Sequence, residues 1–464
     1  MKKFSTAYLV RYFLAFLVIT ILSGCLAILD TLSTADLDDI QKRNKLIAVT
    51  TYSASSYFIY RGQPMGFEYE LLSMFAKEIG VELEIVISKE PSKVKHSLAR
   101  HEADIVAANI AVTRKNANEF QFTDAIAVTR QVLVQRKSDG LIRNQIDLIG
   151  KTVHLYPGSA YVDRVKNLSD EIGGDIEIQN VSSEIIPEKL IAQVSDGTID
   201  YTIAEEGTAL INAAYHPNLD VSTPISFPQR VAWLVRPEAT ELRLKLNEWI
   251  LKIKENGVLD AVYARYFKQS RIAGERMRSG FHSLTGKSIS AYDDLLKKAS
   301  KDAGFDWRLL AAVAYQESRF NPRAKSWAGA TGLMQVMSYT ASGYGYRNLY
   351  DPVENVRISG LYFQSVEKHL AKYELDESEK IHFMLASYNA GPGHVEDAMR
   401  LAEKYGKNPK IWFNNVDEFI LNLANPVYYN DPIVKYGYCR GEEPYLYVKQ
   451  IMERFEHYKR FIDE

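Results

Sequence analysis

Short β-rich runs alternate with amphipathic stretches over residues 45–268, and this alternation restricts the fold of the chain more than any other feature. The runs are Leu46–Thr51, Val81–Ile87, Asp104–Ile110, Gln131–Gln135, Val153–Tyr156, Ile176–Val181, Asp200–Ala204 and Arg230–Val235. Strands separated by amphipathic helices form α/β domains whose sheets are mainly parallel. We therefore expect an α/β domain over residues 45–268.

The segment Arg271–Gly286 interrupts this pattern with glycines and several charged residues. It is expected to be a linker, within residues 269–290, that separates the α/β domain from a second domain over residues 291–464. A chain of 464 residues has room for two or three domains. The formal net charge of -2 gives no reason to expect a nucleic-acid partner.

A glutamate lies on the apolar side of a predicted helix in the second domain. Leu310, Val313, Ala314 and Glu317 are spaced i, i+3, i+4 and i+7, which turns the carboxyl towards the core. Burial disfavours the ionised carboxylate and raises its pKa, which suits a general acid that breaks a glycosidic bond. The same spacing also fits a glutamate at the edge of the apolar stripe that is satisfied by an arginine or a hydroxyl.

Four short motifs follow one another around and after this helix: Glu317-Ser318, Gly332-Leu333-Met334-Gln335, Tyr388-Asn389-Ala390-Gly391 and Tyr447-Val448. In this order they resemble the goose-type-lysozyme-like catalytic domain of the soluble-type lytic transglycosylases, over about Tyr292–Lys459. The longer strings Asp306–Ser318 and Tyr436–Gly441 are similar to one membrane-bound subfamily of these enzymes. The resemblance implies a mainly α, lysozyme-like domain.

This resemblance implies an enzyme that cleaves the MurNAc-GlcNAc β-1,4 bond of peptidoglycan glycan strands and leaves 1,6-anhydroMurNAc ends. Glu317 would act first as acid and then as base, and the acetamido oxygen of the substrate would stabilise the developing cation. No cofactor and no metal ion is implied. The implied substrate-binding residues are Ser318, Ser326, Met334, Gln335, Tyr388, Asn389 and Tyr447. Tyr445 is a rival for the role of Tyr447, and Met334 also fits as core filling.

The α/β segment is similar to the family 3 solute-binding proteins, in which two lobes close on a small ligand. The motifs that carry this likeness are Gly66–Glu70, Ala103–Val106, Thr113, Phe122–Asp124 and Gly197–Tyr201. The likeness implies a regulatory ligand pocket at Thr113, Arg114 and Glu205. Glu205 stands where the family often has an acidic group for the ligand amine, and an exposed or helix-capping role is the alternative. Asn116 stands where the family has an arginine for the ligand carboxylate, which argues against a free amino acid. A muropeptide or stem peptide is the expected ligand.

The N-terminal residues set the expected compartment. Lys2, Lys3 and Arg11 precede the apolar run Tyr12–Leu22, and Leu22-Ser23-Gly24-Cys25 resembles a bacterial lipobox. We expect a signal peptide cleaved before an acylated Cys25, a tether over residues 26–44, and anchoring at the periplasmic face of the outer membrane of a Gram-negative bacterium. An uncleaved membrane anchor is the alternative, because Leu26–Leu29 extend the apolar run. Cys439 would remain a single buried or semi-buried thiol.

Two further functions stay open besides a lytic transglycosylase with an N-terminal ligand-sensing domain. A lysozyme-type hydrolase would need a second carboxylate near Glu317, and Asp351 and Glu354 are the candidates. A non-catalytic receptor would bind glycan strands or a solute without cutting.

Overall fold

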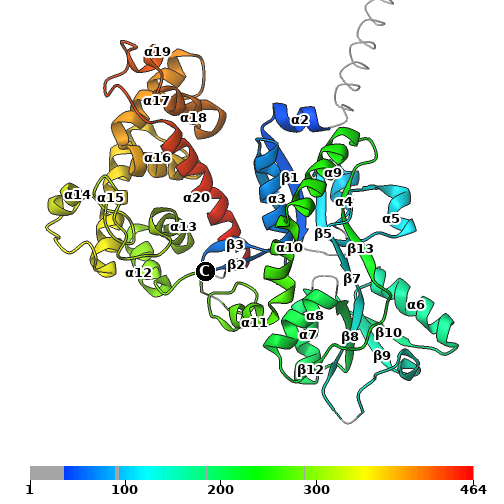
Figure 1. Ribbon diagram of the computed structural model, residues 1–464. Coiled ribbons are helices and arrows are strands. Elements are labelled where there is room, and N and C mark those ends of the chain that lie inside the picture. The colour runs from blue at the N-terminus through cyan, green and yellow to red at the C-terminus, as the bar shows by residue number, and fades with distance from the viewer. Residues whose placement is uncertain are drawn as a thin grey trace, which may run out of the picture. The chain divides into compact units, whose positions relative to one another are not determined.

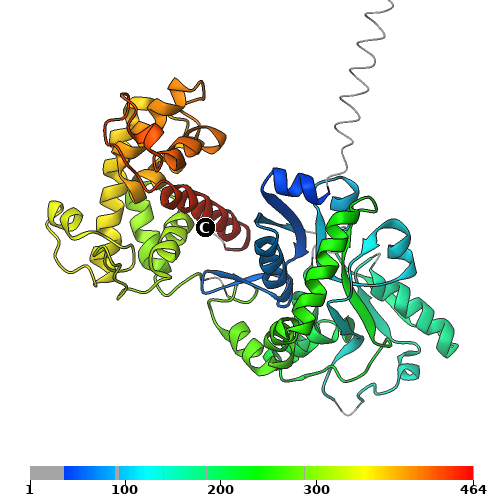
Figure 2. The same cartoon turned by 45° about the horizontal axis from the view of Figure 1, so that its top comes forward.

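The computed structural model describes residues 36–88, 94–138, 140–157, 159–182, 185–286 and 288–462 (Figures 1 and 2). The chain divides into two compact units. The first contains the residues up to Phe58 and Met65–Glu275, and the second contains Ile59–Pro64 and Arg276–Glu464. Within the described residues no helix is both long and apolar enough to cross a membrane. The predicted signal peptide and Cys25 lie outside the described residues.

One lobe of the first unit is built on a sheet in the order β4-β1-β5-β13-β6, with β7 beside β13. Its strands are β1 (Lys45–Thr51), β4 (Glu82–Ser88), β5 (Ile105–Ala111), β6 (Gln121–Phe122), β7 (Ala127–Thr129) and β13 (Gln229–Val235). The helices of this part of the chain are α2 (Leu37–Lys42), α3 (Phe67–Glu78), α4 (His96–Ala99), α5 (Arg114–Glu119), α9 (Thr240–Glu255) and α10 (Val258–Tyr263), which continues into a π-helical turn, Ala264–Lys268. Strand β1 pairs in parallel with β4 and β5, whereas β13 runs antiparallel to β5.

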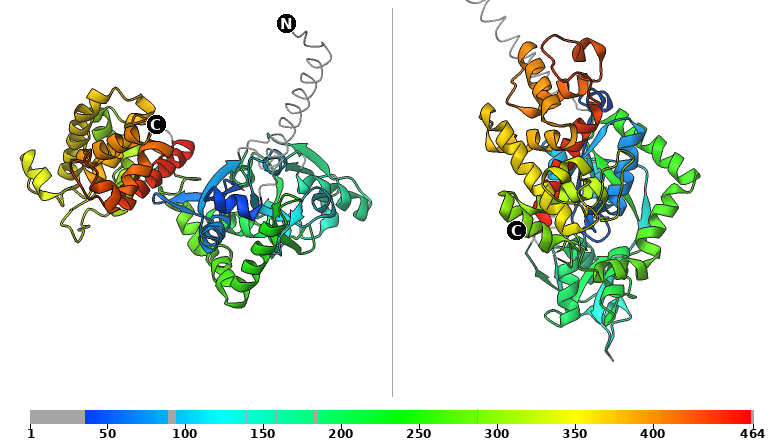
Figure 3. Two further views of the ribbon diagram at one scale, coloured as in Figure 1. Left: turned by 90° about the horizontal axis from the view of Figure 1, so that it is seen from above. Right: turned by 90° about the vertical axis from the view of Figure 1, so that its left-hand side faces the viewer.

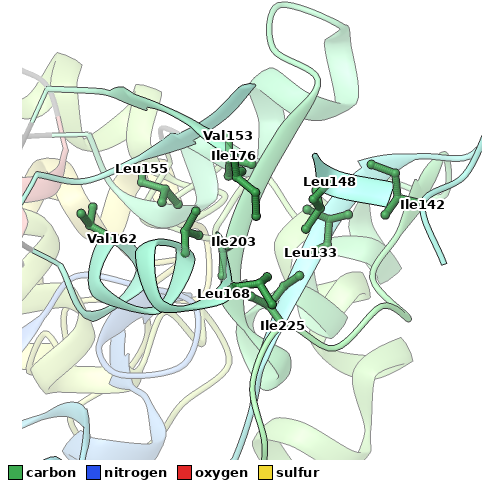
Figure 4. Packing of buried hydrophobic residues seen from close by; sticks show 11 residues of the cluster. Leu133, Ile142, Leu148, Val153, Leu155, Val162, Leu168, Ile176, Ile203 and Ile225 are labelled. Carbon is green, nitrogen blue, oxygen red and sulfur yellow. The ribbon is translucent and has the colours of Figure 1, made fainter. Parts of the chain in front are cut away.

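The other lobe is built on a sheet in the order β10-β9-β11-β8-β12. Its strands are β8 (Gln131–Arg136), β9 (Thr152–Leu155), β10 (Glu177–Asn180), β11 (Tyr201–Glu205) and β12 (Leu219–Asp220), and its helices are a 3-10 turn (Gln145–Leu148), α6 (Ala160–Ile172), α7 (Pro187–Asp196) and α8 (Glu206–Tyr215). Aliphatic side chains of β8, β9 and β11 pack against Val165 and Leu168 of α6 (Figure 4). This buried layer fixes the start of α6, which lines the ligand pocket described below.

Each of the eight predicted runs overlaps a strand, so the α/β prediction for residues 45–268 is confirmed. The sheets are mixed, however, and not mainly parallel. The chain crosses from the first sheet to the second between Thr129 and Gln131, and returns between Asp220 and Gln229. The crossing strands β8 and β13 run antiparallel to their neighbours β11 and β5. The alternation of β-rich runs and amphipathic stretches locates the strands, but it does not show whether a crossing strand runs parallel or antiparallel to its neighbours.

The second unit is helical, as the resemblance implies. Its helices are α12 (Asp293–Ala303), α13 (Trp307–Ser318), α14 (Ser338–Gly343), α15 (Pro352–Leu370), α16 (Glu377–Ala390), α17 (Pro392–Lys404), α18 (Asp417–Asn422), α19 (Pro426–Tyr429) and α20 (Glu442–Phe461), with short turns at Ala371–Tyr373 and Trp412–Val416. Helix α13 is buried from Trp307 to Tyr315 and packs against α12 and α20. Figure 3 gives further views of these helices, in which α16 also lies beside α20. Helix α13 is thus held as the central element that carries Glu317.

A hairpin of β2 (Phe58–Tyr60) and β3 (Gln63–Met65) contributes its tip to the second unit. The Tyr458 hydroxyl donates a hydrogen bond to the carbonyl oxygen of Gly62 (2.8 Å). Gly62 has φ of 74°, and a Cβ atom there would lie 2.7 Å from both Phe320 and Tyr458. Only glycine therefore fits this close approach.

The expected linker Arg271–Gly286 begins in a helix, α11 (Ser270–Arg278). Ala273 and Met277 are both buried and lie four residues apart, so they form one apolar face. This spacing explains a helix in a segment whose composition suggests a linker. The division between the two units falls within α11, between Glu275 and Arg276.

Candidate active site and ligand pocket

Glu317 lies in the last turn of α13, where the helix ends at a cleft. The Asp306 side chain accepts a hydrogen bond from the Arg308 backbone N–H and caps the start of the helix. The helix stops at Arg319, which has φ of 51°. Because the preceding turns of α13 are buried, the backbone of Glu317 is fixed. Its carboxyl can move only by rotation about the side-chain bonds.

The cleft has a volume of about 700 Å³ and contains a mixed set of polar and aromatic side chains. Its lining residues are Gln316, Glu317, Ser326, Trp327, Ala328, Ala330, Gln335, Val336, Met337, Tyr339, Thr340, Ile358, Ser359, Tyr362, Tyr388, Asn389, Ala390, Gly391, Glu443, Leu446, Tyr447 and Gln450. Such a volume accommodates an oligomeric ligand of at least drug size. Polar groups that converge on one carboxyl make this cleft the candidate active site.

Tyr447 is the partner of the Glu317 carboxyl. Its hydroxyl donates a hydrogen bond of 2.6 Å to Oε1 of Glu317, and its side chain is buried. Burial raises the pKa of Glu317 to about 7, the Tyr447 hydrogen bond lowers it in part, and the negative charge of Glu443 raises it further. The carboxyl is therefore a proton donor near neutral pH.

The loop Gly332–Gln335 forms one wall of the cleft and is held from below by Asn355. The buried Asn355 amide accepts from the Met334 N–H (2.7 Å) and donates to the carbonyls of Thr331 (2.9 Å) and Leu349 (3.0 Å). Gly332 has φ of 87°, and a Cβ atom there would lie 2.2 Å from the Leu349 oxygen. A side chain at this position would displace the loop.

Gln335 itself has φ of 48°, and its side-chain amide donates to the carbonyls of Gly332 (2.9 Å) and Ala324 (3.2 Å). These bonds hold its side chain against the loop with the amide at the cleft surface. A left-handed backbone is uncommon for a residue other than glycine and is often found at functional positions. The loop therefore holds the side-chain amide of Gln335 in a fixed position at the cleft surface.

Tyr388 connects two walls of the cleft. Its hydroxyl donates to the Met334 carbonyl (2.8 Å) and lies 3.1 Å from the Ser359 hydroxyl. Its ring stacks on Phe363 with a centroid distance of 4.5 Å. Burial, together with the negative charge of Glu317, raises the pKa of Tyr388, which therefore stays neutral. Asn389, the next residue on α16, also lines the cleft.

The structure gathers most of the predicted residues, but not all of them, around the cleft. Ser326, Gln335, Tyr388, Asn389 and Tyr447 line it with Glu317, whereas Ser318 and Met334 do not. Met334 is fully buried, so it fills the core below the loop. The Ser318 hydroxyl donates to the Leu333 carbonyl (2.7 Å), which ties the end of α13 to the same loop.

Several cleft residues were not identified from the sequence, and they differ in whether a signal existed. Glu443 lies four residues before Tyr447 on α20, so the helical spacing places the two on one face. This spacing could have identified Glu443 once Tyr447 had been predicted as a cleft residue. No such signal exists for Ser359 and Trp327, which line the cleft, or for Asn355, which holds the Gly332–Gln335 loop. Their positions depend on tertiary packing.

The carboxylates considered for a hydrolase serve local structure. The Asp351 side chain caps α15 by accepting from the Val353 N–H (2.8 Å), and the Glu354 side chain accepts from the Asn348 N–H (3.2 Å). Neither lines the cleft. Glu443 is the acidic residue that lines the cleft besides Glu317, and its exposed side chain lies 4.0 Å from Arg440.

A pocket of about 410 Å³ lies in the first unit and includes Thr113, Asn116 and Glu205. The Thr113 hydroxyl accepts from the Asn116 N–H (3.3 Å) and caps α5. The side chain of Arg114 lies outside the described residues, so the structure does not place it. Glu205 is buried, and burial raises its pKa to about 7, against a lowering hydrogen bond from Thr129.

Buried acceptors gather on one side of this pocket. Oε2 of Glu205, Oε1 of Gln131 and the Tyr156 hydroxyl belong to lining residues and have no hydrogen-bond partner within the described chain. Glu188 lies nearby: its Oε1 accepts from the Ala54 N–H (2.7 Å), and burial raises its pKa to about 7. Unpaired buried acceptors are costly, so this group is suited to a ligand that donates hydrogen bonds.

Lys95 contributes a positive charge to the pocket, and this residue was not predicted from the sequence. Its ammonium donates to Oδ1 of Asn116 (2.7 Å), and both residues line the pocket. Asn116 is the residue that replaces the family arginine. The Lys95 ammonium thus brings a positive charge to the pocket beside Asn116.

Cys439 is a free and buried thiol, as the sequence predicts. Burial, with the nearby charge of Glu443, raises its pKa to about 11. The thiol is therefore protonated and unreactive at neutral pH.

Comparison with known proteins agrees with this division of the chain. Residues 46–269 match the bacterial extracellular solute-binding proteins, family 3, and residues 294–411 match the transglycosylase SLT domain. Proteins called membrane-bound lytic murein transglycosylase F are similar over nearly the full length. The one from Desulfosudis oleivorans is 35% identical, covering 90% of both chains, and the one from Stutzerimonas stutzeri is 31% identical, covering 91% of this chain and 86% of the relative.

Among solved structures, an amino acid ABC transporter substrate-binding protein from Streptococcus pneumoniae bound to L-arginine matches with a TM-score of 0.45. It is 22% identical, and the match covers 51% of this chain and 98% of that one.

Proposed function

Because the chain belongs to the membrane-bound lytic murein transglycosylase F family and is a peptidoglycan lytic transglycosylase, we propose that Glu317 is its catalytic acid and base. The observation that supports this most directly is the hydrogen bond from Tyr447 to a Glu317 carboxyl whose pKa lies near 7. A carboxyl of this pKa holds a proton at neutral pH and can give it up readily.

In the first step Glu317 protonates the oxygen that leaves the anomeric carbon of N-acetylmuramic acid. The bond from that carbon to the oxygen breaks, and the acetamido oxygen of the substrate stabilises the cation. In the second step the Glu317 carboxylate takes the proton of the C6 hydroxyl, whose oxygen closes onto the anomeric carbon. The product is a 1,6-anhydro sugar, and Glu317 ends in its protonated state. We propose that Gln335, Tyr388 and Asn389 bind the sugar beside the acid.

The nature of the new chain ends separates the three functions that the sequence leaves open. Wild-type protein acting on purified sacculi is expected to yield 1,6-anhydro ends, as measured by mass spectrometry of the released fragments. Reducing ends would identify a hydrolase, and the absence of new ends would identify a receptor. Glu354→Gln is the matched control, because Glu354 lies outside the cleft and its loss should leave the product unchanged.

A second proposed function belongs to the pocket of the first unit, which we assign to a muropeptide or stem peptide with a free amine and a free carboxylate. Glu205 and Gln131 offer acceptors to the amine, and Lys95 offers its ammonium to the carboxylate. Binding of such a ligand would regulate the catalytic unit if the ligand favours one conformation over another. Activity on sacculi is measured with and without stem peptides, and peptides that neither bind nor change activity contradict the proposal.

We also propose that Cys25 is acylated after signal-peptide cleavage and anchors the enzyme at the periplasmic face of the outer membrane. This rests on the lipobox-like Leu22-Ser23-Gly24-Cys25 alone. Cys25→Ser should abolish lipid labelling and leave the precursor unprocessed. A mature N-terminus upstream of Cys25, or an intact Met1, would favour the uncleaved anchor instead.

A further inference from the structure

Two large aromatic side chains stand in solvent at the wall of the catalytic cleft. Trp327 is 92% exposed and Tyr339 is 75% exposed, and both line the cleft that contains Glu317. The other tryptophans of the chain, Trp233, Trp249, Trp307 and Trp412, are buried. An indole in water keeps a large apolar area hydrated, so its placement inside a cleft indicates a surface for a ligand.

Hydrogen bonds within a tight turn hold Trp327 in this position. The Ser326 carbonyl accepts from the Gly329 N–H (3.1 Å), and the Ser326 N–H donates to the Ala330 carbonyl (2.9 Å). The Ser326 hydroxyl closes the turn by accepting from the Ala330 N–H (3.0 Å). Trp327 therefore lies at the tip of an ordered turn, and Tyr339 lies in the first turn of α14. Both rings are presented from hydrogen-bonded backbone.

We propose that Trp327 and Tyr339 form a stacking subsite for a sugar ring of the glycan strand, beyond the ring whose glycosidic oxygen Glu317 protonates. This inference rests on the proposed function of the cleft. A pyranose ring presents one face of C–H groups, which packs on the electron-rich face of an aromatic ring, while its hydroxyls stay hydrated at the edge. Binding of this kind holds the strand without taking part in the reaction.

The charges of the cleft favour a sugar over a stem peptide at this subsite. Glu443 lines the cleft beside Glu317, so an anionic ligand would meet like charge there. An N-acetylglucosamine unit of the glycan strand is uncharged, and it carries the C–H face that an indole requires. Trp327 and Tyr339 thus determine how firmly a strand is held.

The kinetic test uses the full-length enzyme on purified glycan strands. Trp327→Ala should raise KM about three- to tenfold with little change in kcat, since an aromatic contact stabilises bound substrate and product alike. Trp327→Phe should restore most of the affinity, and Tyr339→Ala should give a smaller rise. Tyr350→Ala is the control, because this tyrosine is 49% exposed but lies outside the cleft. An unchanged KM in Trp327→Ala, or an equal rise in the control, overturns the subsite.

A binding test does not depend on turnover. In a Glu317→Gln background, a β-1,4-linked N-acetylglucosamine oligomer should shift the tryptophan emission to shorter wavelength, and the added change Trp327→Phe should remove that shift. A shift that stem peptides produce, that the oligomer does not produce and that Trp327→Phe removes would contradict the sugar assignment. Retained cleavage by Glu317→Gln would overturn the proposed function, whereas lost cleavage with no emission shift would overturn only the subsite.

Discussion

The catalytic cleft and the pocket of the first unit each contain a glutamate whose pKa burial raises to about 7, yet the two are partnered differently. In the cleft, Glu317 accepts a hydrogen bond from the Tyr447 hydroxyl and lies beside Gln335 and Asn389. In the pocket, Glu205 has an oxygen with no partner in the described chain, beside the equally unpaired Gln131. A raised pKa therefore does not by itself identify a catalytic acid.

The partners explain the difference. A carboxyl held by one strong donor has a fixed orientation, which proton transfer to a defined atom requires. Glu205 also accepts a hydrogen bond from Thr129, but its Oε2 and the Oε1 of Gln131 have no donor in the described chain. These two atoms stay unsatisfied until a ligand brings donors, which is what a sensor needs. The first arrangement is suited to repeated chemistry, and the second to binding.

Substituting each glutamate gives the largest expected contrast. Glu317→Gln keeps the shape and can still accept from Tyr447, but it cannot donate and recover a proton. Loss of general acid-base catalysis costs ~10²–10⁴ in rate, and this residue serves both steps. Glu205→Gln should leave basal activity on sacculi near that of the wild type. Equal losses in both variants, or normal turnover by Glu317→Gln, would remove the contrast.

When ligand binding to the pocket of the first unit is measured, the large effect is expected for the pocket variants and not for Glu317→Gln. Glu205→Gln and Lys95→Ala each remove a charge that a zwitterionic ligand would meet, and a charge-assisted hydrogen bond accounts for about 10- to 100-fold in Kd. Titration calorimetry with a stem peptide on the full-length protein measures the change. Lys151→Ala is the control, because Lys151 lies outside the pocket. Unchanged affinity in both variants would show that the peptide binds elsewhere.

The sequence predicts these two regions unequally well, for physical reasons. Glu317 stands in a local pattern, a helical stripe with ordered motifs behind it, so its position on the apolar face follows from residue spacing alone. The strands that flank the pocket were predicted as well, because each is a short apolar run. Lys95 was not, since its contact with Asn116 joins residues that no periodic pattern links. Asn355 of α15 supports the Gly332–Gln335 loop, and it was not predicted for the same reason.

In two places the structure shows detail that local composition and motifs do not give. The glycines of Arg271–Gly286 indicated a linker, but the buried Ala273 and Met277 show an apolar helical face there. Ser318 and Met334 belong to the motifs, and for that reason they were predicted to bind substrate. Their contacts show that a motif can be needed to build a loop and not to touch a ligand.

The pH dependence sharpens the role of Tyr447. Because Glu317 must be protonated, kcat/KM should fall about tenfold per pH unit above pH 7. Tyr447→Phe removes the hydrogen bond that lowers this pKa, so the falling limb should move to higher pH while the maximal rate drops about tenfold. Tyr445→Phe is the matched control. A limb that moves to lower pH, or does not move, would contradict the assigned contact.

The smallest effect concerns stability. The pKa of Glu317 in the folded state, about 7, lies above the ordinary value of 4.5, so the folded state binds the extra proton between these pH values. Its contribution to stability is fully present below pH 4.5 and is lost as the pH rises through 7. Glu317→Gln removes this loss and should stabilise the protein at pH 8 by about 1–2 kcal/mol, after a discount for partial exposure.

Thermal unfolding of both proteins at pH 8 and pH 4 measures this difference. The variant should melt a few degrees higher at pH 8 and level with the wild type at pH 4. Glu354→Gln is the control, because Glu354 lies in the first turn of α15 and outside the cleft. If Glu317→Gln is stabilised by the same amount at both pH values, the ionised carboxylate of Glu317 does not destabilise the folded state. The desolvation that we assign to the catalytic acid would then have no support.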